Sequence, residues 1–234
     1  MNSSKKSILN SNFTYLAAFV LPVIMMMALY YTRGIFPWGN ECYLRSDMYH
    51  QYAPFFSELW HKIRNGESLT YSWNIGMGTN FTSLFAYYLA SPSNWFVALF
   101  PQKYTIEIMN AFIILKIAGS SLSLTYYLTK HNNNKHVIAA IFGMFYGMSG
   151  FIAAYSWNIM WLDCVILIPL IMLGLERLVN ENRCIFYCIT LGLCIFTNYY
   201  IAIMVCLSVV IYYVVLMIAY NGIKSPMQLS LIHI

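Results

Sequence analysis

Apolar residues in this chain occur in long unbroken blocks, and the alternation that marks a half-buried strand is missing from them. About 20 consecutive apolar residues are enough for a helix to cross the hydrocarbon core of a bilayer. Six blocks have this character, of which the fifth is short: residues 13–32, 106–129, 137–155, 164–179, 184–197 and 201–220. The pattern predicts an all-α polytopic membrane protein with about six transmembrane helices.

Residues 33–103 form a long connection in which polar and apolar positions are mixed. Within it, residues 81–100 are apolar, but Pro92 interrupts them and Pro101 follows. Proline removes a helical hydrogen bond and clashes with the preceding turn. We therefore expect a loop with short or re-entrant helices here, which are stable at membrane depth only when protein covers them or they line a cavity.

The distribution of Lys and Arg orients the predicted spans. The short connections at 156–163 and 198–200 contain neither residue, whereas the intervening connections contain Lys130, Lys135, Arg177, Arg183 and Lys224. Because cytoplasmic loops are enriched in Lys and Arg, we expect a cytoplasmic N-terminus and an extracellular loop at 33–103. A further crossing within 81–100 would invert every later connection, so the same pattern argues that this segment does not cross.

Composition narrows the class of partner. Only 9% of the 234 residues are charged and 60% are hydrophobic, whereas soluble domains carry about 25% charged residues. The net charge of +5 is scattered along the chain. Nucleic-acid binding requires clustered cations, so no nucleic-acid partner is expected and the lipid bilayer is the predicted environment. Gly143, Gly147 and Gly150 are expected to permit close helix packing.

The densest polar cluster follows the first predicted span, at residues 43–52. If this segment is helical, Asp47, His50 and Gln51 share one face. A carboxylate beside an imidazole can act as a general base or bind a divalent cation. The alternative is a solvated loop whose charges have no chemical role, and composition alone favours that alternative.

Other polar residues extend this candidate site. The loop cations Arg33, Arg45, Lys62, Arg64 and Lys103 could hold the phosphate of a lipid-linked substrate, or simply pair with Glu41, Glu58, Glu67 and Glu107. Asp163, at a membrane edge, could pair with a loop cation or cap its helix. Lys116 lies deep in a predicted span, where an ionisable group usually faces a cavity or a partner.

Several short motifs, taken in order, resemble the bacterial membrane protein YfhO family over residues 13–224. They are Ser46-Asp47-x-x-His50-Gln51-Tyr52, Leu69-x-Tyr71-Ser72-Trp73, Gly76-x-Gly78, Tyr87-Tyr88, Ser91-Pro92-x-Asn94, Trp157-Asn158, Trp161-Leu162-Asp163 and Asn198-Tyr199-Tyr200. Each motif is weak by itself, but the ordered set is fairly specific.

The resemblance implies a GT-C-like membrane glycosyltransferase. Such an enzyme moves a sugar from a polyprenyl-phosphate carrier onto an envelope polymer such as lipoteichoic acid, at the outer face of the membrane. Asp47 occupies the position of the catalytic acidic residue in the first outer loop, and His50 is expected to orient Asp47 or the acceptor. The expected substrate-binding residues are Arg45, Gln51, Tyr52, Trp73, Asn74, Asp163 and Asn198. No cofactor is required by this hypothesis, although a divalent cation is compatible with it.

Two other classes remain open: a transporter or flippase of lipid-linked sugars, and a non-catalytic envelope-assembly protein. Family members resembling this chain are several times longer. Residues 1–228 are therefore expected to be the N-terminal part of a single GT-C-like transmembrane domain, and residues 229–234 a tail foreign to it.

Overall fold

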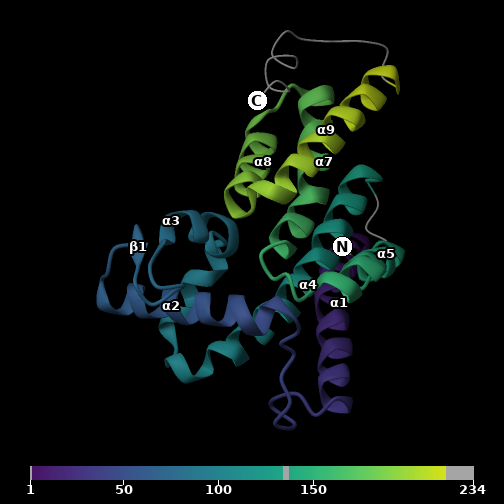
Figure 1. The fold of residues 1–234 in the computed structure, drawn as a ribbon. Helices are drawn as coiled ribbons and strands as arrows, with labels where there is room; N and C mark the ends of the chain where they lie inside the picture. The colour runs from purple at the N-terminus through teal and green to yellow at the C-terminus, as the bar shows by residue number, and fades with distance from the viewer. Residues whose placement is uncertain (1, 134–136, 220–234) are drawn as a thin grey trace.

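The computed structural model describes residues 2–133 and 137–219 of the chain. Lys135, Lys224 and the expected foreign tail at 229–234 lie outside the described residues. Long helices dominate the fold (Figure 1). The described helices outside residues 33–104 are α1 (Asn2–Thr32), α4 (Thr105–His131), α5 (Val137–Gly147), the short α6 (Gly150–Tyr155), α7 (Leu162–Glu181), α8 (Ile185–Thr197) and α9 (Tyr199–Ala219). The predicted all-α membrane class is confirmed.

The expected number of six crossings is supported only in part. Among the described residues, four segments are long and apolar enough to span a bilayer: Asn12–Thr32, Gln102–His131, Val137–Tyr155 and Tyr199–Ala219. Helix α8 has 13 residues, which is short for a crossing. Helix α7 has 20 residues but includes Asp163, Glu176 and Arg177, and these charges set it apart from a simple lipid-facing span.

The third span is broken near its middle. Helix α5 ends at Gly147 and α6 begins at Gly150. A Cβ atom on Gly147 would lie 2.8 Å from the carbonyl oxygen of Ile117 in α4, so the glycine permits the close approach of the two helices. Gly143 faces α4 in the same way. The expectation for Gly150 was wrong, because no atom lies within 4 Å of the position of its Cβ.

Residues 33–104, called the loop layer below, fold beside the long helices (Figure 1). As predicted, they form short helices. In chain order these elements are η1 (Met48–Tyr52), α2 (Ala53–Asn65), α3 (Phe81–Leu84), η2 (Phe85–Leu89), η3 (Pro92–Leu99) and η4 (Gln102–Tyr104). A two-stranded antiparallel hairpin, β1 (Tyr71–Ser72) and β2 (Thr79–Asn80), lies between α2 and α3.

One apolar core ties the loop layer to the long helices. Met48, Tyr52 and Phe56 of the loop layer are buried in the same cluster as Met109 and Ile113 of α4. A second core joins α7, α8 and α9. The loop layer is therefore packed against the membrane helices.

Candidate functional site

Asp47 lies at the start of η1, on the edge of the loop layer. The chain turns just before it, where Ser46 takes a positive φ of 48°, a conformation uncommon for residues other than glycine. Asp47 is half-buried. No hydrogen bond or ion pair joins its carboxylate to any other described residue. The carboxylate is thus held in place by its backbone and is available to a ligand.

Tyr52 lies one helical turn beyond Asp47 and links the loop layer to the connection between α6 and α7. Its hydroxyl donates a hydrogen bond of 2.8 Å to Oδ1 of Asn158, and its ring stacks on Trp157 with centroids 6.2 Å apart. Burial raises the pKa of the Tyr52 hydroxyl, and the nearby negative charge of Asp47 raises it further. The hydroxyl therefore stays protonated and acts as a donor. The Nδ2 atom of Asn158 is buried and has no partner within the described part of the chain.

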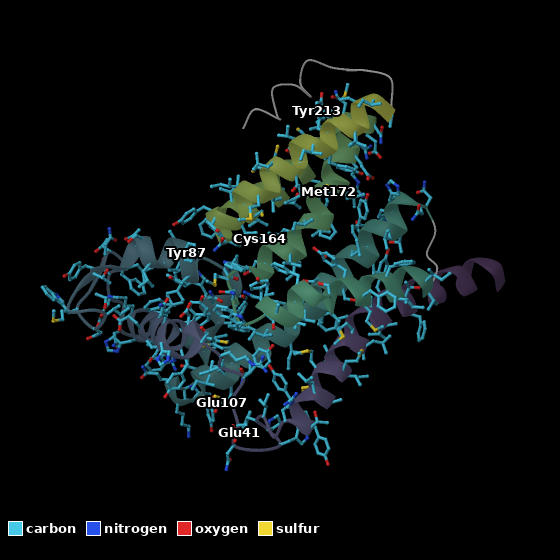
Figure 2. All side chains as sticks on the ribbon, turned by 45° about the vertical axis from the view of Figure 1, so that its right-hand side comes forward. Glu41, Tyr87, Glu107, Cys164, Met172 and Tyr213 are labelled. Carbon is cyan, nitrogen blue, oxygen red and sulfur yellow. The ribbon has the colours of Figure 1, made fainter. Side chains whose placement is uncertain are left out.

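Tyr87 and Tyr88 of η2 complete this arrangement. The Tyr88 hydroxyl donates to Oε1 of Gln51 at 3.4 Å, and its ring lies 5.4 Å from that of Tyr52. Burial raises the pKa of Tyr88, with the charges of Tyr87 and Asp47 adding to the shift. Figure 2 shows Tyr87 at the junction of the loop layer with the long helices.

Asn198, which precedes α9, joins the same junction. Its Nδ2 donates to the carbonyl oxygen of Tyr87 at 3.0 Å, and its Oδ1 accepts the backbone N–H of Ile201 at 2.9 Å. It therefore caps α9 while anchoring η2. The rings of Tyr87 and Tyr199 lie 5.7 Å apart. The name aromatic–amide cluster is used below for Gln51, Tyr52, Tyr87, Tyr88, Trp157, Asn158, Asn198 and Tyr199.

Asp163 lies in the first turn of α7, where a negative charge suits the helix N-terminus, but its cation is not one of the loop cations expected. Its Oδ2 lies 2.7 Å from Nζ of Lys116 in α4, so it pairs with a membrane-helix cation, and no loop-layer cation lies within ion-pair distance of it. Lys116 also donates to the carbonyl oxygen of Ile159 at 3.2 Å and to Oγ of Ser91 at 3.3 Å. These bonds connect α4, α7 and the loop layer.

Four predicted site residues lie apart from this cluster. His50 is exposed and contacts the ring of Tyr49 edge-on, with no hydrogen bond to Asp47. Arg45 lies over the ring of Tyr43. Trp73 is 77% exposed in the turn after β1. Asn74 donates to Oε2 of Glu58 at 3.0 Å, and so belongs to a separate network.

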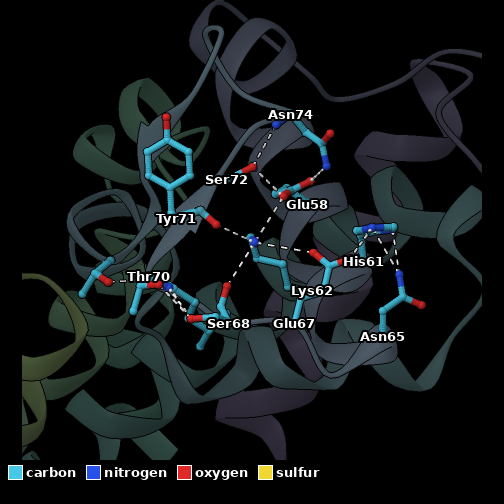
Figure 3. A network of polar contacts seen from close by, with 12 residues as sticks. Glu58, His61, Lys62, Asn65, Glu67, Ser68, Thr70, Tyr71, Ser72 and Asn74 are labelled. Carbon is cyan, nitrogen blue, oxygen red and sulfur yellow. Dashed lines mark hydrogen bonds and ion pairs between the residues drawn. The ribbon is translucent and has the colours of Figure 1, made fainter.

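That network braces the hairpin against α2 (Figure 3). Glu58 accepts hydrogen bonds from Ser72 at 2.6 Å and from Asn74. Lys62 lies 3.7 Å from Glu58 and donates to the carbonyl oxygen of Tyr71 at 2.8 Å. Burial alone would raise the pKa of Glu58, but the two hydrogen bonds and Lys62 together lower it. The network holds the hairpin against α2.

The site residues predicted from the sequence do not include Tyr87, Tyr88, Trp157 or Asn158, although their motifs are part of the family resemblance. Their role depends on contacts over 106 and 111 positions of the chain, such as Tyr52 with Asn158 and Tyr87 with Asn198. No search of nearby spacing can detect such pairs. No group of three or more His, Cys, Asp or Glu side chains suited to a metal ion occurs in the described ranges.

Apolar spanning helices, with a folded polar layer packed at one end of the bundle, define this chain as a multi-pass membrane protein. The chain belongs to the family described as Bacterial membrane protein YfhO, whose sequence profile matches residues 17–233. The resemblance seen in the short motifs is thereby confirmed. Neither the curated proteins nor the solved structures include a match to this chain.

Proposed function

We propose that this chain carries the catalytic part of a membrane glycosyltransferase of GT-C type. The observation that carries the proposal is the half-buried carboxylate of Asp47, which has no partner in the described structure and lies beside the aromatic–amide cluster. A general base must be free to accept a proton from a bound hydroxyl. Aromatic faces and amide groups, in turn, suit the apolar faces and hydroxyls of a sugar.

The proposed reaction is sugar transfer from a polyprenyl-phosphate carrier to an envelope polymer such as lipoteichoic acid. Asp47 takes the proton of an acceptor hydroxyl as that oxygen forms a bond to the anomeric carbon. The bond from the anomeric carbon to the phosphate oxygen breaks, and its electron pair leaves with the lipid phosphate. Arg45, two residues from Asp47, offsets the charge that develops on this leaving group. Tyr52, Gln51 and Asn158 position the sugar.

We further propose that this site faces the outside of the cell. The described cations Lys130, Arg177 and Arg183 lie near the far ends of α4 and α7, away from Asp47. These ends of α4 and α7 are in contact, because Nδ1 of His131 in α4 lies 2.9 Å from Oε2 of Glu176 in α7. Since cytoplasmic ends are rich in Lys and Arg, this arrangement supports a cytoplasmic position for those ends and an outer position for the loop layer.

A transporter or flippase of lipid-linked sugars is the second candidate, favoured by the Lys116–Asp163 pair inside the helix bundle. In a transport pathway this pair would be required for activity. Neutral replacement of Lys116 alone does not test that requirement, because it leaves the carboxylate of Asp163 without its cation. The double replacement Lys116→Met with Asp163→Leu is the appropriate test, and loss of sugar incorporation in a folded double variant would favour transport.

The function itself is tested by Asp47→Asn in the intact gene, expressed in the native cell. The substitution keeps the size of the side chain and removes the base, so incorporation of the sugar into the envelope polymer should be lost while the amount of protein in the membrane is unchanged. Glu67→Gln, in the same loop layer and exposed, is the matched control and should retain incorporation. Normal incorporation with Asp47→Asn would refute the catalytic role.

A further inference from the structure

The tip of the β1–β2 hairpin, residues 73–78, exposes two large apolar side chains. Trp73 is 77% exposed and Met77 is 96% exposed, although tryptophan and methionine side chains are mostly buried in folded proteins. Figure 1 shows the hairpin at the end of the loop layer that lies away from the long helices. The spanning helices therefore do not bring this tip to the hydrocarbon core, and its apolar side chains are available to a partner outside the bilayer.

Met77 also has an unfavourable backbone conformation. Its φ is 62°, and Gly76 and Gly78 on either side of it have φ of 57° and 113°. A positive φ suits glycine and is costly for a residue that has a Cβ atom. The turn therefore favours glycine at position 77 and gives no reason for an exposed methionine, whereas a contact made by the methionine side chain does.

The rings of Tyr71 and Trp73 are held in one arrangement beside the tip. Their centroids lie 4.9 Å apart at an interplanar angle of 70°. Both rings lie over Gly78, because a Cβ atom there would collide with the Tyr71 hydroxyl and lie 3.1 Å from Cε3 of Trp73. Between the two rings in the chain, Ser72 donates a hydrogen bond of 2.6 Å to the buried Glu58 (Figure 3). A ring surface fixed in this way loses little conformational entropy when a ligand binds.

The chemistry of the hairpin narrows the class of partner. Residues 68–80 contain no Asp, Glu, Lys, Arg or His, so the surface offers no cation to a phosphate or an anionic headgroup. The Tyr71 hydroxyl, the Thr79 hydroxyl and Nδ2 of Asn80 make no hydrogen bond to another described residue. Rings beside free hydroxyl and amide groups suit a sugar, whose faces are apolar and whose edges carry hydroxyls. The tip is also small compared with the roughly 800 Å² that each partner buries in a stable protein interface.

We propose that the hairpin tip binds a sugar ring of a cell-envelope glycan. The ring of Trp73 stacks on the apolar face of the sugar, and Met77 extends that apolar surface. Tyr71, Thr79 and Asn80 make hydrogen bonds to the sugar hydroxyls. The outer position of the tip and the identity of this glycan as the acceptor polymer rest on the proposed function, but the binding itself does not.

The direct test is binding of envelope polysaccharide to the detergent-solubilised protein, measured by fluorescence anisotropy. The polysaccharide is taken from the native cell, freed of lipid and labelled at one end. The wild-type protein should bind it, and Trp73→Ala should weaken binding by at least about tenfold, as expected for the loss of a central tryptophan contact. Trp38→Ala is the matched control. Trp38 is 43% exposed in the same loop layer and lies edge-on to Tyr31, so this variant should bind as the wild type does.

Two treated samples of the polysaccharide identify the ligand. Oxidation with periodate opens sugar rings that carry vicinal hydroxyls and should abolish binding, whereas digestion with a protease should leave binding unchanged. Loss of binding after protease digestion would assign the tip to a protein partner and overturn the proposal. Undiminished binding after complete oxidation, undiminished binding by Trp73→Ala, an equal loss with Trp38→Ala or no binding by the wild-type protein would overturn it as well.

Met77→Gly provides a second test, because it separates binding from folding. Glycine relieves the positive φ at this position, so Tm in detergent should be unchanged or higher. Binding of the polysaccharide should nevertheless weaken, since the apolar contact of the methionine is lost. Full binding by Met77→Gly would contradict the inclusion of Met77 in the binding surface.

Asp47→Asn separates this inference from the proposed function. It should bind the polysaccharide as the wild type does, because it leaves the hairpin intact. If Trp73→Ala binds normally while Asp47→Asn abolishes sugar transfer, the glycan site fails and the function stands. If binding depends on Trp73 while Asp47→Asn still transfers sugar, the function fails and the glycan site stands.

Discussion

Replacement of Lys116 by methionine is expected to destabilise the protein strongly, since Lys116 holds three parts of the fold together. Its ammonium group contacts Asp163 of α7 at 2.7 Å, the carbonyl oxygen of Ile159 and the hydroxyl of Ser91. The side chains of Lys116 and Asp163 are only 5% and 14% exposed. Methionine fills a similar volume but removes every one of these donors.

The size of the effect follows from what the substitution leaves behind. Breaking a buried ion pair by removing one partner costs about 3–5 kcal/mol, because the remaining charge is buried without compensation. Replacing both partners by apolar residues of similar volume is often neutral or stabilising. Lys116→Met should therefore lower the stability by about 4 kcal/mol, and Lys116→Met with Asp163→Leu should recover most of that loss.

Thermal unfolding of the purified protein in detergent measures both variants. For a chain of this size, 1 kcal/mol corresponds to roughly 2–4 °C in Tm. The single variant should thus unfold about 10 °C below the wild type, and the double variant close to it. Lys103→Met, at an exposed lysine over the ring of Tyr104, is the control and should leave Tm unchanged. Equal Tm values for the single and double variants would refute the idea that an unpaired Asp163 is the cause.

Two further variants test the packing and the loop-layer network. Gly174→Ala should lower Tm, because its Cβ would lie 2.7 Å from the backbone Cα of Tyr187 and force α7 and α8 apart at a cost of about 1–3 kcal/mol. The control is Gly192→Ala, which has open space at its Cβ and should leave Tm unchanged or raise it. The same fall in Tm for both variants would contradict this explanation. Glu58 has a lowered pKa, so its contribution to stability is fully present above its unfolded-state pKa of about 4.3 and is lost as the pH falls through the lower folded-state value. A pH series of Tm should therefore show a smaller loss on acidification for Glu58→Gln than for the wild type, and identical pH profiles would contradict it.

The sequence predicted the membrane class well because long apolar blocks have few structural alternatives. The short helices at 81–99 were predictable because Pro92 interrupts the apolar run there. The number of spans was harder to predict, because α7 is as long as a span but carries Asp163, Glu176 and Arg177, and Asp163 is paired with Lys116 inside the bundle. Hydropathy counts such a pair as two unfavourable charges and cannot show that they neutralise each other.

The candidate site was predictable only where its residues are close in the chain. Asp47 and Gln51 were predicted from the polar segment at 43–52. The expected contact between Asp47 and His50 on one helical face is absent, because Asp47 precedes a π-helical turn and His50 is exposed. The family resemblance placed Trp73 and Asn74 in the site, yet Asn74 binds Glu58 in a separate network. Asn158 could not be selected, since its partner Tyr52 is 106 positions away.

The most direct measurement of the central claim is sugar transfer by the purified protein. A polyprenyl-phosphate donor carrying a labelled sugar is incubated with the envelope-polymer acceptor in detergent, where no membrane separates two compartments and transport alone cannot produce a labelled polymer. The proposed function predicts label in the polymer with the wild-type protein and none with Asp47→Asn. Label transferred equally by both proteins would contradict the assignment of Asp47 as the catalytic base, and label transferred by neither would contradict the proposed function.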